Sequence, residues 1–189
     1  MRTRLPGFKG ECLWEFDIAD RQLSALAEAF PAERYGSRSA ETARSVSEIL
    51  VHVAAGSLIL LGIVGVDAAP DLYGKLESEV VPRMLGMIKK NDSLEKTITD
   101  KQAVIALLRR SLDAVRETFT QTSDAELERQ DVFFGERTTV RRVYMRGLSH
   151  MHEHMGQLVG YMRAMGLAAP WPDWRDSGRK IIEQGRKVS

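Results

Sequence analysis

Histidine is the residue type that most clearly indicates chemistry in this 189-residue chain. Of its four histidines, His150, His152 and His154 lie within five residues of one another. Residues four apart in a helix share a face, so the imidazoles of His150 and His154 can converge on one ion. His152 is rotated by roughly 200° from His150 and is expected to point away, to solvent or to a partner subunit. This spacing predicts half of a metal site.

The other half must come from a different helix, and His52 is the remaining histidine. It lies between Ile49 and Val53 on an apolar helical face, where an unpaired imidazole would be costly to bury. A hydrogen bond or a metal ion would remove that cost. Three imidazoles leave a coordination position open, as in catalytic zinc sites. We predict that His52, His150 and His154 bind one divalent metal, with Zn²⁺ favoured and Ni²⁺, Fe²⁺ or Mn²⁺ as alternatives.

Other catalytic motifs do not fit. Gly156 stands where a zincin motif starting at His152 would place its second histidine, and no Glu-x-x-His pair of a di-iron bundle occurs. By their predicted positions on the helices, Asp17 and Tyr161 could face the histidine site. No residue can be assigned as a general base.

Cys12 is the one cysteine, which excludes an internal disulfide and favours a reducing cytoplasm. We expect its thiol to be inert.

Helices must position these residues, and two are predicted in the first third of the chain. The first runs from about residue 11 to residue 30, where Pro31 ends it. The second begins near Ser45, whose spacing to Glu48 is that of a capping box, and ends near Gly65. This second helix carries His52.

Two further long helices follow a crossover. Residues 76–90 form a weaker helical stretch, interrupted by Pro82 and Gly86, and residues 91–95 are expected to break the chain. The third helix opens with the capping-box spacing of Thr99 and Gln102.

A connection at residues 124–135 leads to the fourth helix, from about Thr138 to Met165, with Gly166 as its C-terminal cap. The expected fold is all-α: a four-helix up-down-down-up bundle with a long crossover. Residues 1–189 form a single domain, with a core at about 11–170 and a charged tail at 171–189.

The segment from His150 to Gln157 resembles the His-x-x-x-His-x-Gly-Gln signature of the DinB/YfiT-like superfamily. The stretch from Arg44 to His52 is similar to the first metal-ligand segment of that family. Weaker similarities cover nearly the whole chain: Asp100-Lys101, Phe134-Gly135, Tyr161-Met162-Arg163 and Pro170-Trp171.

The resemblance implies a four-helix bundle and a metal held by three histidines, which are His52, His150 and His154 here. It implies close helix packing at Gly156 and a local hydrogen bond from Gln157. Relatives include thiol-dependent S-transferases and a thiol-dependent isomerase. The expected function is a metal-dependent enzyme that transfers a thiol to a small electrophile. A metal-dependent hydrolase and a non-catalytic metal- or ligand-binding stress-response protein are the alternatives.

Composition and charge limit the classes of partner that we expect. With 27 basic and 26 acidic residues the net charge is +1, which gives no reason to expect nucleic acid. The most apolar run, residues 49–66, falls short of a membrane span of about 20 residues and reads as a core helix. A small-molecule substrate or thiol is the expected partner. A homodimer is also expected, because these apolar residues cannot all face one core: Leu50, Val53, Leu58, Ile59, Leu61 and Val64.

Overall fold

The computed structural model describes residues 7–75 and 77–171 and is mostly helical. The predicted tail lies, except for Trp171, outside the described residues. The long helices are α1 (Gly7–Ala29), α2 (Val46–Ile63), α4 (Val80–Thr97), α5 (Lys101–Gln121) and α7 (Val140–Ala164). The short elements are η1 (Ala32–Arg34), α3 (Pro70–Tyr73), α6 (Asp124–Leu127), β1 (Gln130–Phe133) and β2 (Glu136–Thr139).

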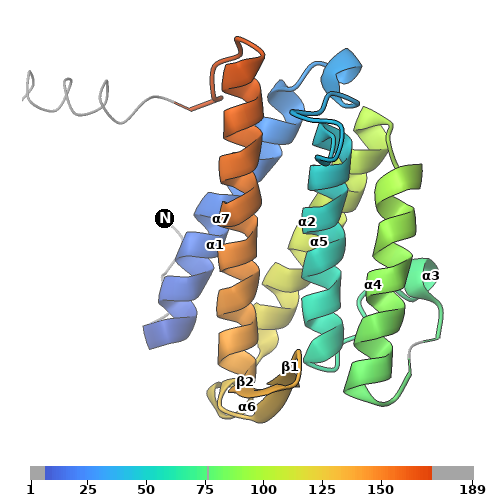
Figure 1. Cartoon of the computed structure of the whole chain (residues 1–189). Coiled ribbons are helices and arrows are strands. Elements are labelled where there is room, and N and C mark those ends of the chain that lie inside the picture. Colours follow the sequence, from blue (N-terminus) through green and yellow to red (C-terminus); the bar gives the residue numbers. More distant parts are fainter. Residues whose placement is uncertain (1–6, 76, 172–189) are drawn as a thin grey trace, which may run out of the picture.

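Four of the long helices form the expected bundle. Helices α1 and α7 run in one direction and α2 and α5 in the other, which is the up-down-down-up order (Figure 1). Each of α1 and α2 packs against both α5 and α7. Helix α4 is the crossover, and it returns along the outer side of α2 (Figure 1). The all-α prediction is confirmed.

The start of α2 follows the predicted capping box. The Ser45 hydroxyl accepts from the backbone N–H of Glu48, and the Glu48 carboxylate accepts from the N–H of Ser45 at 2.7 Å. The start of α5 does not follow its prediction. Its cap is Asp100, whose carboxylate accepts from the N–H groups of Gln102 and Ala103, so the Thr99 capping box is wrong. A carboxylate next to the first helical residue is one of the preferred N-caps.

The crossover is one continuous helix. Pro82 is its third residue, where a backbone N–H has no intrahelical acceptor in any case, so the proline does not interrupt it. Gly86 is exposed, so it destabilises the helix only through the low helix propensity of glycine. Residues 91–95 form the last turns of α4 and do not break the chain, and Asn91 and Glu95 are buried there. This correction matters because it places Glu95 against α2.

The connection before α7 holds more structure than expected. It contains α6 and a hairpin in which Gln130 pairs with Thr139 and Phe133 with Glu136. Phe134 and Gly135 have φ values of 49° and 86°, the left-handed pair that a two-residue hairpin turn requires. With only four residues in each strand, the alternation is too short to stand out in the sequence.

By length and composition alone α2 could span a membrane, contrary to the expectation that its apolar run is too short, but 72% of it is buried inside the bundle, as in a core helix. Its apolar side chains pack against α4, α5 and α7. The crossover therefore covers much of the surface for which a partner subunit was expected. The homodimer stays a prediction, but the apolar surface of α2 supports it less than expected, because α4 covers much of that surface.

Candidate metal centre

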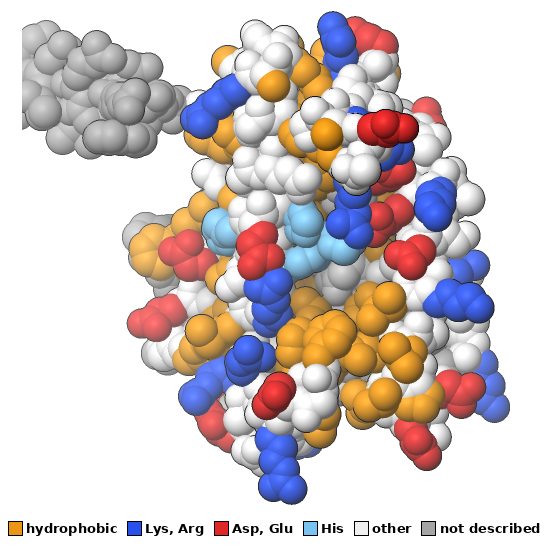
Figure 2. Space-filling model, viewed as in Figure 1, with side chains coloured by type: hydrophobic (Ala, Val, Ile, Leu, Met, Phe, Trp, Pro, Cys, Tyr) orange, Lys and Arg blue, Asp and Glu red, His pale blue; other side chains and the backbone are white. Residues whose placement is uncertain are grey.

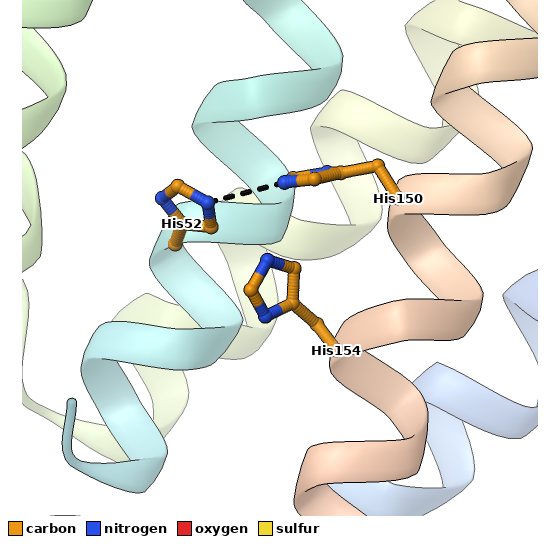
Figure 3. A group of neighbouring side chains, drawn as sticks. All are labelled: His52, His150 and His154. Carbon is orange, nitrogen blue, oxygen red and sulfur yellow. Dashed lines mark hydrogen bonds between the residues drawn. The ribbon is translucent and has the colours of Figure 1, made fainter. Parts of the chain in front are cut away.

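The three predicted ligands come together from two neighbouring helices. His52 projects from α2, while His150 and His154 project from successive turns of α7 toward it (Figure 3). One ring nitrogen of each residue lies within 4.8 Å of those of the other two. The i, i+4 spacing on α7 produces the shared face, and the packing of α7 against α2 supplies the third imidazole.

The spacing of these nitrogens suits one small ion. The Nε2 atoms of His52 and His150 are 3.1 Å apart and share a hydrogen bond (Figure 3). Two nitrogens bound tetrahedrally to zinc at about 2.0–2.1 Å would be about 3.3 Å apart. The pair is thus already near the separation that a common ion requires.

Two of the rings are oriented by a second contact on their far side. His52 Nδ1 lies 2.7 Å from a carboxylate oxygen of Glu95, and His154 Nδ1 lies 3.0 Å from the side-chain oxygen of Gln157. Both oxygens are acceptors, so each Nδ1 carries the proton and donates it. The Nε2 lone pairs are then left for a metal, the arrangement by which outer carboxylates and amides fix metal-binding histidines.

Glu95 was not predicted as a site residue. Its side chain is 9% exposed, and its other oxygen accepts from Nε of Arg44 at 2.7 Å. Burial by itself would raise the pKa of Glu95, but the hydrogen bonds from His52 and Arg44 outweigh it and lower the pKa below its usual value. An ionised carboxylate is therefore held behind His52. The residues Met87, Asn91 and Leu94, which are buried, have the spacing of one helical face. This spacing could have indicated that Glu95 lies on a helix packed against the bundle.

Burial also keeps imidazoles of the cluster neutral. It lowers the pKa of His150 to about 3, with further lowering by His154 and His52. The pKa of His154 is lowered by burial as well. A neutral imidazole is the form that binds metal, so protons compete weakly for these two residues.

A glycine on α2 makes room for one ring. A Cβ atom on Gly56 would lie 2.8 Å from Cε1 of His150 and 3.3 Å from its Nδ1. With only hydrogen at this position, Cε1 of the His150 ring can approach the backbone of α2 closely. The resemblance placed close packing at Gly156, but a Cβ there would meet no atom within 4 Å. That expectation is wrong, and Gly56 has the role.

His152 and Cys12 stand outside the cluster. His152 is exposed, and its Nδ1 lies 2.9 Å from the carbonyl oxygen of Leu148 in its own helix. It points away from the other histidines, as predicted from its helical phase. Burial raises the pKa of the Cys12 thiol to about 11, which agrees with an inert cysteine.

The two residues suggested for the pocket, Asp17 and Tyr161, lie in different surroundings. Asp17 forms an ion pair with Arg116 of α5 at 2.8 Å, so it belongs to the α1–α5 contact and not to the histidine site. Tyr161 lies near the site, where its hydroxyl donates to the carbonyl oxygen of Arg44 at 2.8 Å and accepts from Ser39. It braces the loop before α2.

The site is open to solvent and borders apolar surface. Figure 2 shows the histidine side chains at the surface, with a hydrophobic patch directly below them. The helices under this patch carry a small hydrophobic cluster that is separate from the main core and is built on Ile63 of α2, Met84 of α4 and Val143 of α7. The following partly buried side chains pack against it: Ile59, Leu60, Val64, Val80, Ile88 and Phe133.

Comparisons with known proteins agree with the fold. The model of the DinB family matches residues 4–184. A DinB-like protein from Bacillus cereus ATCC 10987 superimposes with a TM-score of 0.63 at 17% identity, over 86% of this chain and 95% of that one. A DinB-like protein from Bacillus subtilis gives 0.62 at 20% identity, over 87% and 96%.

A third solved structure is the mycothiol-dependent maleylpyruvate isomerase, with a TM-score of 0.59 at 14% identity. The match covers 84% of this chain and 63% of the isomerase. At these identities the likeness shows a common fold. No curated protein sequence matches this chain.

Proposed function

The chain belongs to the DinB family, and from that premise we propose that it is a metal-dependent enzyme that transfers a thiol to a small electrophile. His52, His150 and His154 are the proposed ligands of one divalent metal, with Zn²⁺ favoured. The observation that carries this proposal is the set of three converging imidazoles, open on one side to solvent (Figure 2).

Three neutral ligands suit catalysis better than a structural role. Structural zinc sites are usually closed by four protein ligands, whereas catalytic sites keep a position for water or substrate. Among the described residues, the cluster contains no fourth histidine, cysteine or carboxylate. A bound metal would lower the pKa of a thiol at that position and so supply a thiolate nucleophile.

The protein's own groups orient and shelter the site. Glu95 and Gln157 fix the tautomers of His52 and His154, so that Nε2 of each faces the centre. The hydrophobic patch below the histidines can take the apolar body of an electrophile and exclude water from the reacting sulfur (Figure 2). In the transfer, the thiol gives its proton to solvent, a sulfur–carbon bond forms, the carbon–halogen bond of a halogenated electrophile breaks, and halide leaves with the bonding electrons.

The comparisons support thiol chemistry in part. One protein of the same fold is described as a mycothiol-dependent isomerase. That description belongs to the isomerase, but it shows that the fold can serve a thiol-dependent reaction. Here it favours a thiol over water as the nucleophile.

A turnover screen tests the proposal. The zinc-loaded protein is incubated with several low-molecular-weight thiols and a chlorinated aromatic electrophile, and thioether and chloride are measured. We expect metal-dependent turnover that is lost in His154→Ala and kept in His152→Ala, a matched histidine on the same helix. Absence of turnover with every thiol would overturn the transferase. Metal-dependent ester cleavage without thiol would indicate the hydrolase instead.

A further inference from the structure

An open pocket lies beside the metal centre, on the side of Glu95 and Gln157. Its volume is about 520 Å³, and its charged lining consists of Arg38, Arg44, Lys96, Glu48 and Glu95. Gln157 also lines it. Because Glu95 contacts His52 and Gln157 contacts His154, the pocket and the histidines share a wall. A small molecule could therefore reach both.

The two carboxylates of the pocket are already satisfied. Glu48 accepts two hydrogen bonds from Arg38, at 2.6 and 2.7 Å. Glu95 accepts from Nε of Arg44 and from His52. Neither carboxylate is left to attract a cationic ligand.

Two cations of the pocket keep unused donors. Within residues 7–75 and 77–171, the Arg44 side chain makes one hydrogen bond, through Nε, which leaves both terminal nitrogens of its guanidinium available. Lys96 is exposed and has no hydrogen bond or ion pair to the described part of the chain. The pocket thus has one more positive than negative charge, and its free donors are cationic.

Arg44 is also held in place. Its carbonyl oxygen accepts from Tyr161, and its Nε is anchored by the buried Glu95 carboxylate. A guanidinium fixed at Nε presents its two terminal nitrogens as a fork, the geometry that binds a carboxylate or phosphate through paired hydrogen bonds.

We propose that this pocket, lined by Arg44 and Lys96, binds a carboxylate or phosphate group of the thiol that reacts at the histidines. The inference rests on the proposed function. The charged pocket and the hydrophobic patch border the same centre, so the two substrates can occupy unlike surfaces: the anionic thiol beside Arg44, and the apolar electrophile on the patch (Figure 2).

Titration with two thiols tests the pocket. Cobalt(II)-loaded protein is titrated with mercaptosuccinate, which carries two carboxylates, and with neutral 2-mercaptoethanol, and the thiolate–cobalt absorption band gives both dissociation constants. We expect mercaptosuccinate to bind at least about tenfold more tightly at low salt, with a smaller advantage at high salt. Lys96→Gln should reduce the advantage about threefold or more. Lys89→Gln, an exposed lysine two turns away on α4, should leave it unchanged.

Calorimetric titration with succinate and with inorganic phosphate provides the second arm. Binding of either anion that weakens in Lys96→Gln but not in Lys89→Gln supports the pocket, and the tighter of the two identifies the anionic group. If such binding occurs but no thiol produces the cobalt band, the proposed function fails while the anion site stands. Equal affinity for the two thiols, or no binding of either anion, would overturn the inference.

Discussion

Replacing Gly56 with alanine tests the site at a position that no metal-binding motif contains. The new Cβ would lie 2.8 Å from Cε1 of His150, whereas ordinary contacts begin near 3.4 Å, so the ring must move by roughly 0.6 Å. Metal–ligand distances tolerate about 0.2 Å. The ring can turn aside, so folding should survive, but His150 would no longer reach the shared ion in good geometry. We expect zinc affinity to fall about 10- to 100-fold, the range typical when a supporting contact of a ligand is lost.

Competition with a chromophoric chelator measures this change. Gly156→Ala is the matched control, because a Cβ there meets no atom within 4 Å and alanine improves helix propensity by about 1 kcal/mol. That variant should bind zinc like the wild type. Thermal unfolding of both metal-free variants checks that each is folded. If Gly56→Ala bound zinc as tightly as the wild type, the assignment of His150 as a ligand would be refuted.

Three further predictions follow from the same geometry. Metal analysis should find stoichiometric metal in His152→Ala and almost none in His154→Ala; equal loss from both would contradict the helical phase. The unfolded chain protonates His150 near its usual pKa of 6.5, whereas the native pKa is about 3. The metal-free protein should therefore lose stability as pH falls from 6.5 toward 3, by about 1.4 kcal/mol per pH unit for this proton. Urea unfolding of His150→Gln should show a shallower slope; an unchanged slope would contradict the buried neutral ring. Sedimentation equilibrium should show a homodimer that Val81→Lys or Leu85→Lys weakens, since these crossover side chains are 47% and 58% exposed; a 21.2 kDa species at all concentrations would refute it.

The sequence was most informative where periodicity and residue chemistry agreed. The i, i+4 pair on α7 and a single histidine within an apolar stripe were sufficient to predict which three imidazoles meet. The capping box at Ser45 and the glycine after α7 located helix ends, and Gly166 indeed has a φ of 72°. Local signals of this kind survive folding because neighbouring residues in the chain supply them.

The missed features depend on contacts between distant segments. Glu95 becomes a partner of His52 only when α4 packs on α2, 43 positions away in the chain. Breaker residues misled the prediction there, because Pro82 lies in the first turn of α4, where it is tolerated. Gly56 is one of several small residues in the apolar run at residues 49–66, and its role appears only once the His150 ring lies against it.

Anomalous diffraction from crystals of protein purified without added metal tests the central claim most directly. Data collected on both sides of the absorption edge identify the element and locate it. We expect one peak between α2 and α7, at about 2.0–2.2 Å from one ring nitrogen each of His52, His150 and His154. A metal peak elsewhere, or zinc-soaked crystals with no peak among these three rings, would contradict the assignment of the site.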